Sequence, residues 1–219
     1  MARTSPPVRG EHRLPVTVTV LAAMALPFLL PERLSLGPAW LVPALIGVLL
    51  VAITLADPVR ITRRSRTLRL LEVGVVVLLI LGASWSTTRL VLDLVQGGSE
   101  TNNATVLLTT GAFVWIGNNL AFALLYWELD TGGPAERAHH VARYPDLAFP
   151  GHMNPNVVAP EWRPVFVDYL YLGLTNALAF SPTDVMPLAH WAKLTMAIQS
   201  LISVMLLSLI IARAVNIFT

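Results

Sequence analysis

Six apolar segments dominate this chain of 219 residues and limit what it can fold into. A helix needs roughly 20 apolar residues to cross about 30 Å of hydrocarbon. The candidate segments are residues 14–30, 38–56, 70–95, 104–127, 165–180 and 188–218. None of them alternates apolar and polar residues as the strands of a membrane barrel do. The sequence therefore predicts an all-α, polytopic integral membrane protein whose short fifth segment either spans the membrane or re-enters.

The composition fits a chain that folds in lipid. Hydrophobic residues make up 55% of the chain and charged residues 13%, whereas soluble domains carry about 25% charged residues. The absence of cysteine excludes disulfides and thiolate metal sites. No nucleophile-elbow, zinc-protease, P-loop or Rossmann pattern is present, so we expect neither enzyme activity nor a cofactor. The basic residues lie beside apolar segments, which predicts the lipid bilayer as partner and no nucleic acid.

The distribution of basic residues predicts the orientation, because cytoplasmic loops carry an excess of Lys and Arg. If all six segments span and the N-terminus is cytoplasmic, twelve of the fifteen basic residues lie inside. The five arginines of residues 60–69 contribute most. If the fifth segment re-enters from the cytoplasm, Lys193 moves inside and Arg213 outside, and the division is unchanged. With its single lysine and many Ala, Leu and Val residues, the chain is typical of a GC-rich bacterial genome, which predicts the bacterial inner membrane.

The chain divides into four parts. These are a cytoplasmic tail (1–13), a four-helix membrane region (14–127), a Pro-rich hydrophilic loop (128–164) and a C-terminal part (165–219). The density of prolines in the loop forbids a long helix there. The loop also contains His139, His140 and His152, but their spacing fits no standard zinc pattern, so we expect no metal.

The C-terminal part carries the most chemical information. Its short apolar segment contains Thr175 and Asn176, and is followed by Ser181-Pro182-Thr183-Asp184, then Pro187 and a long apolar segment. This order resembles the pore helix, filter loop and inner helix of potassium channels. The resemblance implies permeation of an ion or small solute through a homo-oligomer. If the assembly is channel-like, the homo-oligomer is a tetramer.

The filter loop differs from that of potassium channels. Glycines there let successive carbonyl groups point at the ion, whereas Pro182 fixes its own φ near −65°. Selectivity would then come from the side chains of Asp184, Thr183 or Asn176. An ordinary channel loop also enters from outside, which would place residues 60–69 outside, against the charge distribution.

Four short stretches resemble the C-terminal half of a family of uncharacterised bacterial multi-pass membrane proteins. They are residues 146–151, 166–171, 181–184 and 214–217. The resemblance covers roughly residues 113–218 and implies an integral membrane protein.

Polar residues at membrane depth are candidates for lining a pathway. Asn118 and Asn119 lie in the middle of the fourth segment, and Gln199 and Ser203 lie one turn apart in the last one. Thr175 and Asn176 would extend this polar strip. The alternative is that these side chains only bond neighbouring helices, as in a non-transporting membrane scaffold or partner subunit.

Charged residues near the segment ends predict local pairs. Arg89 and Asp93 have the spacing of a pair within one helix, and so do Arg69 and Glu72. Asp168, at the start of the fifth segment, is predicted to favour the positive end of the helix dipole. The alternative is that it pairs with Arg163 or with another helix.

Overall fold

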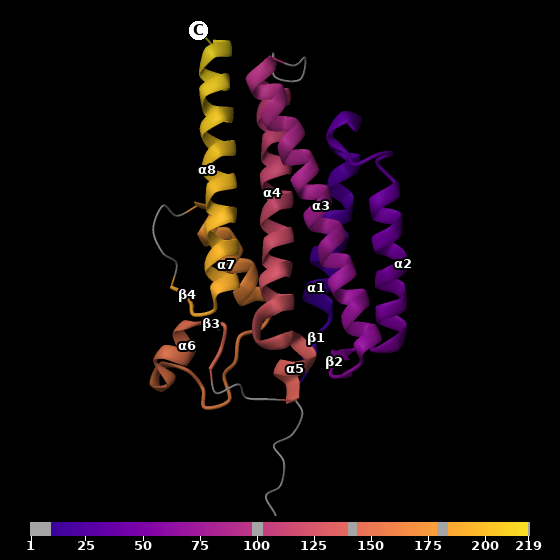
Figure 1. The fold of residues 1–219 in the computed structure, drawn as a ribbon, viewed down its shortest axis with the longest axis vertical. Helices are drawn as coiled ribbons and strands as arrows, with labels where there is room; N and C mark the ends of the chain where they lie inside the picture. The colour runs from indigo at the N-terminus through magenta and orange to yellow at the C-terminus, as the bar shows by residue number, and fades with distance from the viewer. Residues whose placement is uncertain (1–9, 98–102, 140–143, 179–183, 219) are drawn as a thin grey trace, which may run out of the picture.

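A computed structural model describes residues 10–97, 103–139, 144–178 and 184–218 of the chain. Its helices stand side by side along the long axis of the molecule (Figure 1). Within these residues, three helices are long and apolar enough to cross a membrane. They are α3 (Arg66–Gln96), α4 (Ala104–Leu129) and α8 (His190–Phe218). The prediction of a mostly helical chain is confirmed, and the three long apolar helices fit a membrane protein.

The two helices of the N-terminal part are shorter. Helix α1 (Leu14–Ala25) has 12 residues and α2 (Leu41–Ala56) has 16, or about 18 and 24 Å. The short helices η1 (Leu26–Phe28) and η2 (Glu32–Leu34) connect them. These lengths fall short of the roughly 20 residues that a membrane crossing needs, so the structure bears out three candidate spans and not six.

Local sequence signals explain where the long helices begin and end. Asn103 caps α4, because its side-chain oxygen accepts hydrogen bonds from Thr105 N at 2.9 Å and Val106 N at 3.2 Å. Helix α3 ends at Gly97, whose φ of 79° lies in the left-handed region that glycine adopts without steric cost.

Short elements gather at one end of the bundle, which we call the base. They include two antiparallel strand pairs, which the sequence did not predict. The strands are β1 (Glu11–His12) with β2 (Arg60–Ile61), and β3 (Leu147–Ala148) with β4 (Met186–Pro187). The Pro-rich loop forms η4 (Asp130–Gly132), α5 (Pro134–His139), α6 (Pro150–Met153) and η5 (Pro155–Val157). Residues 10–13, assigned from sequence to a cytoplasmic tail, belong to this folded base.

Helix α7 (Phe166–Leu178) enters the bundle from the base and the chain returns to the base before α8 begins. Strand β3 precedes α7 and strand β4 follows it, and the two strands pair. Leu188 N also donates a hydrogen bond to Asp146 O at 2.8 Å. Both ends of the segment that contains α7 are therefore held at the same end of the molecule (Figure 1).

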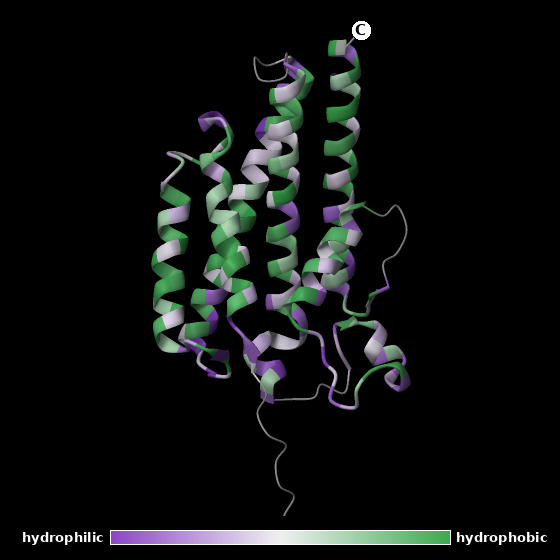
Figure 2. Cartoon of the chain, turned by 180° about the vertical axis from the view of Figure 1, so that it is seen from behind, coloured by the Kyte–Doolittle hydropathy of each residue, from purple (hydrophilic) through white to green (hydrophobic). Residues whose placement is uncertain are grey.

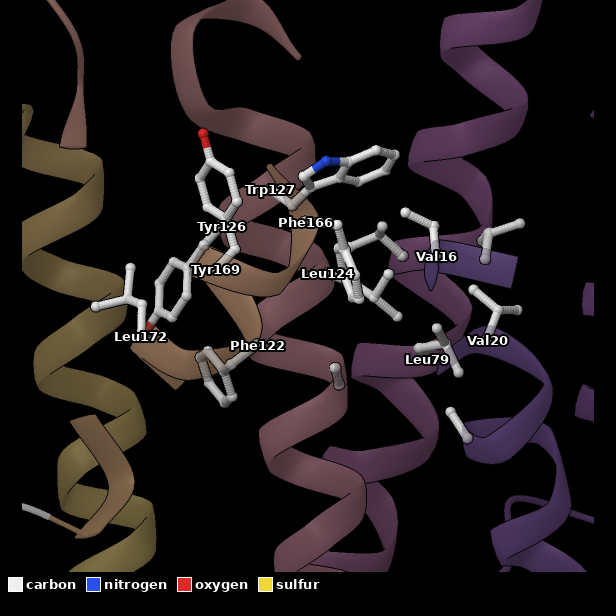
Figure 3. Packing of buried hydrophobic residues seen from close by; sticks show 14 of the residues in the cluster. Val16, Val20, Leu79, Phe122, Leu124, Tyr126, Trp127, Phe166, Tyr169 and Leu172 are labelled. Carbon is white, nitrogen blue, oxygen red and sulfur yellow. The ribbon is translucent and has the colours of Figure 1, made fainter. Parts of the chain in front are cut away.

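The core forms around α4, which packs against α1, α3, α7 and α8. Figure 3 shows this packing, with Val16 of α1 and Leu79 of α3 on one side of Leu124, and Tyr169 of α7 on the other. The outer surface is also apolar. Leu55, Leu70 and Leu201 are 80%, 71% and 71% exposed, and the outer helices are largely hydrophobic (Figure 2). An apolar outer surface of this extent marks contact with lipid or another protein.

Candidate functional site

Helix α7 has one buried and one exposed face. Buried side chains recur at helical spacing along one face: Phe166, Tyr169, Leu172, Asn176 and Ala177. The exposed face is apolar as well, with Val167, Tyr171, Leu174 and Leu178 between 41% and 57% exposed. The buried face lies against α4 and α8, so these two helices position the polar side chain of Asn176.

A cluster of side-chain amides joins α4, α7 and α8. We call the side-chain amides of Asn119, Asn176 and Gln199, together with the hydroxyl group of Tyr126, the amide cluster. The Oε1 atom of Gln199 accepts hydrogen bonds from the Tyr126 hydroxyl and from Asn176 Nδ2, both at 2.7 Å. Its Nε2 donates to Gly173 O at 2.9 Å and to Asn119 Oδ1 at 3.4 Å. Gln199 is 1% exposed, so its amide is buried with all of these bonds made inside one chain.

Helix α8 also satisfies main-chain groups at the end of α7. The last four carbonyl groups of a helix lack a partner within it. The Ser200 hydroxyl donates a hydrogen bond to Asn176 O at 3.1 Å. Asn176 Nδ2 in turn donates to Met196 O at 3.0 Å. The end of α7 is therefore fixed to α8 by hydrogen bonds in both directions.

The other predicted polar residues have separate roles. Asn118 donates to Thr87 Oγ1 at 2.6 Å and so binds α4 to α3. Thr175 bonds back to Tyr171 O at 2.9 Å within α7. Ser203 is buried, and Asp184 is exposed. Ser181, Pro182 and Thr183 lie outside the described residues. The structure thus brings Asn119, Asn176 and Gln199 together but does not bring Asn118 or Thr175 into the same cluster.

A second polar cluster lies at the base around Asp130, and no sequence pattern predicts it. The Tyr169 hydroxyl donates to Asp130 Oδ2 at 2.5 Å. Arg137 donates to the main-chain oxygens of Asp130 and Trp127 at 2.7 and 2.8 Å. Its guanidinium carbon lies 5.0 Å from the centre of the Tyr169 ring, within the range of a cation–π interaction.

Glu11 connects the N-terminal strand to this cluster. Its carboxylate accepts hydrogen bonds from Trp127 Nε1 at 2.9 Å and from Phe166 N at 3.1 Å, and it pairs with Arg137 at 3.3 Å. Phe166 begins α7, and the first N–H groups of a helix lack partners within it. Glu11 therefore caps α7 from the far end of the sequence.

Three further ion pairs differ from the predicted ones. Arg69 pairs with Glu128 of α4, and Glu72 pairs with Arg13 at 3.7 Å, in place of the predicted pair between Arg69 and Glu72. Asp93 pairs with Arg33 at 3.2 Å. Arg89, its predicted partner, lies with its guanidinium carbon 5.9 Å from the Trp85 ring.

The start of α7 agrees with its prediction. The Asp168 side chain accepts a hydrogen bond from Val165 N at 2.7 Å. A carboxylate in this first turn also interacts favourably with the helix dipole.

Two histidines of the Pro-rich loop, His139 and His152, bond to the main chain, and His140 lies outside the described residues. His139 Nε2 lies 2.8 Å from Thr62 O, and His152 Nδ1 accepts from Phe149 N at 3.2 Å. Partial burial of the ring lowers the pKa of His152, and the charge of Asp130 opposes that shift. Within residues 10–97, 103–139, 144–178 and 184–218, no three potential metal-ligating side chains of His, Asp or Glu converge.

Comparison with protein-family models, curated proteins and solved structures finds no match to this chain. The geometry of α7, the amide cluster and the base therefore carries the functional argument.

Proposed function

We propose that this chain is a channel-like membrane protein in which α7 is a re-entrant helix that supports cation permeation in a homo-oligomer. The observation that carries the proposal is the pairing of β3 with β4, which holds both ends of the α7 segment at the base. With 13 residues, α7 is about 20 Å long and too short to cross about 30 Å of hydrocarbon.

The depth of the C-terminal end of α7 calls for a covered or water-filled environment. Asn176 contacts Met196 and Ser200, which lie about 9 and 15 Å along α8 from His190. Helix α7 ends at Leu178, two residues after Asn176, so its last main-chain carbonyl groups lie near this level. Such groups are tolerated at membrane depth only where protein buries them or where they line a water-filled cavity.

A homo-oligomer would provide that environment. The exposed apolar face of α7 lies on the outside of a single chain, so a neighbouring copy on this face would cover α7 and its C-terminal end. A tetramer is the arrangement that the resemblance to potassium channels implies.

A cation is the solute that the local charges favour. The C-terminal end of a helix carries about half a negative elementary charge, and α7 points this end away from the base. Asp184, between α7 and α8 in the chain, is exposed. The amide cluster is buried and its hydrogen bonds are made within the chain, so it would hold α7 in place. The pathway itself would be lined by α8 and by the segment that contains Asp184.

The orientation follows from the charges. Residues 60–69 and Lys193 both lie at the base, so the positive-inside rule assigns the base to the cytoplasm. This arrangement inverts the potassium-channel pore loop, which enters from outside. Residence in a bacterial inner membrane and membership of the family of uncharacterised multi-pass proteins stay predictions.

Sidedness labelling tests the re-entrant topology. The chain has no native cysteine, so a Thr219→Cys variant can be labelled in intact cells with a membrane-impermeant maleimide. Labelling at Thr219→Cys and protection at Lys193→Cys would support the re-entrant arrangement. Protection at Thr219→Cys, with the N-terminus shown to be inside, would mean a full crossing by the α7 segment and would refute it.

Ion flux into proteoliposomes tests the function. We expect cation flux from the reconstituted chain and an altered rate or ion preference in Asp184→Asn. Glu32→Gln is the matched control, because Glu32 is also an exposed acid and lies in η2, away from α7. Equal cation flux from the wild type and Asp184→Asn would show that Asp184 is not part of the pathway.

The second candidate function is a membrane scaffold or partner subunit without transport. The saturation of the amide cluster inside one chain favours it, because such groups serve helix packing without any pathway. Correctly oriented proteoliposomes that pass no ion would favour the scaffold over the channel-like protein.

A further inference from the structure

A cleft at the base carries an excess of arginine. It has a volume of about 300 Å³ and lies between the start of α3 and α5. The charged residues that line it are Arg63, Arg64, Arg66, Arg69, Glu72 and Glu136. Ligand pockets in proteins begin at about this size, so the cleft can hold a small anionic group.

Neighbouring acids neutralise only some of these arginines. Arg64 forms a two-point pair with Glu136, and Arg69 pairs with Glu128. Arg66 is exposed and has no hydrogen-bond or ion-pair partner among the described residues. Arg63 is also exposed, and its side chain donates from one nitrogen to Ala56 O at 3.3 Å. The cleft thus retains cationic groups that are available to a ligand.

The start of α3 adds main-chain donors to the same cleft. Ser65, which also lines it, precedes the helix and makes no side-chain cap, and the first turn of α3 contains no acidic residue. The first N–H groups of this 31-residue helix therefore lack a side-chain acceptor from Ser65. Arginine side chains together with such N–H groups suit the oxygens of a phosphate group.

The position of the cleft indicates where the phosphate comes from. Leu70, one turn after Arg66 on α3, is 71% exposed on the apolar outer surface. The cleft therefore lies where that surface meets the charged base, at the expected level of lipid headgroups. Basic pockets at this level bind anionic lipid headgroups. We propose that the cleft binds a phosphate-bearing anion, supplied by the headgroup of an anionic phospholipid. This inference does not rest on the proposed permeation function.

Native mass spectrometry of the intact purified protein tests the proposal. The probes are phosphatidylglycerol, phosphatidylcholine and inorganic phosphate, each added to protein in detergent. We expect the wild type to bind phosphatidylglycerol more tightly than phosphatidylcholine. Arg66→Gln should weaken phosphatidylglycerol binding by about fivefold, the effect of one arginine near the membrane surface. Arg66 makes no contact that the fold requires, so the variant should fold normally.

Arg89→Gln is the matched control, because it removes the same charge from α3 outside the cleft. Its phosphatidylglycerol affinity should equal that of the wild type. Equal weakening by Arg66→Gln and Arg89→Gln would overturn the site, and so would equal affinity for the two lipids. Displacement of phosphatidylglycerol by inorganic phosphate at matched concentration would overturn the lipid as the source and assign the cleft to free phosphate.

Discussion

Gln199 of α8 donates a hydrogen bond to the main-chain oxygen of Gly173 in α7, across 2.9 Å. The two residues are 26 positions apart, and strand β4 at the base lies between them in the chain. Both are buried. This contact fixes the position of a helix of 13 residues, fewer than the roughly 20 that a membrane crossing needs.

Replacing Gln199 by Ala should loosen α7. The change leaves the Tyr126 hydroxyl and Gly173 O without their side-chain partner in a buried site. We expect a loss of about 1–2 kcal/mol in the free energy of unfolding, because the cost of an unsatisfied buried group is moderated in membrane proteins. Thermal unfolding in detergent, followed by tryptophan fluorescence, measures the loss.

Ser208→Ala is the control for this change, because Ser208 is an exposed polar residue of the same helix. Its thermal midpoint should match that of the wild type. A Gln199→Ala protein as stable as Ser208→Ala would show that the amide cluster does not hold α7.

Gly173 should tolerate no side chain. A Cβ atom there would lie 3.2 Å from Ala123 Cβ and 3.3 Å from Asn119 O, both on α4. We expect Gly173→Ala to cost about 1–3 kcal/mol by overpacking, and Ala123→Gly in the same chain to restore part of it. The comparison variant is Gly74→Ala, where the new Cβ would meet Leu49 Cδ1 at an ordinary 3.5 Å. Chemical denaturation of the wild type and the three variants measures these losses in the free energy of unfolding. Equal losses for Gly173→Ala and Gly74→Ala would show that the close approach of α7 to α4 is not the cause.

The sequence located the amide cluster only in part. Asn119, Asn176 and Gln199 stand out because amides at membrane depth are rare and need partners. Their mutual contact was not predictable, since Asn119 and Gln199 are 80 positions apart. The apolar lengths predicted the three long helices. Strands β3 and β4 have only two residues each, which is too short to give a recognisable sequence pattern. Their pairing nevertheless holds the chain before and after α7 at the base.

The base was predicted least well, because its bonds join distant segments. Glu11 and Trp127 are 116 positions apart. Helical spacing predicted a pair between Arg69 and Glu72, but the buried carboxylate of Glu128 binds Arg69 instead. Glu72 is compensated by Arg13. An ion pair at helical spacing stabilises a helix by only about 0.2–0.5 kcal/mol. This is less than the cost of leaving a buried carboxylate without a cation.

Acidification should loosen α6. Partial burial of the ring, only partly opposed by the charge of Asp130, lowers the pKa of His152 below its ordinary value of 6.5, so the folded state binds protons less readily than the unfolded state. The contribution of neutral His152 is fully present above pH 6.5 and is lost as the pH falls through the lower folded pKa. The thermal midpoint of the wild type should therefore fall more between about pH 7.5 and about pH 5 than that of His152→Asn, which keeps an acceptor for Phe149 N but does not titrate. An identical fall in both proteins would exclude His152 as a source of pH dependence.

The pair between Arg69 and Glu128 should show strong coupling. Glu128 is 1% exposed, and a Cβ at Gly133 would collide with Arg69 Nη1, so the guanidinium lies tightly against the turn after α4. Arg69→Gln removes the ion-pair partner of the buried Glu128 carboxyl and should cost about 1–3 kcal/mol, because the carboxyl can then take up a proton but stays poorly hydrogen-bonded. Glu128→Gln, which keeps a neutral acceptor, should cost less. The double variant should be more stable than Arg69→Gln alone, because it no longer buries an unpaired carboxyl group. A double-mutant cycle from denaturant unfolding in detergent measures the coupling. Additive losses in the cycle would mean that the two side chains act independently and that solvent neutralises Glu128.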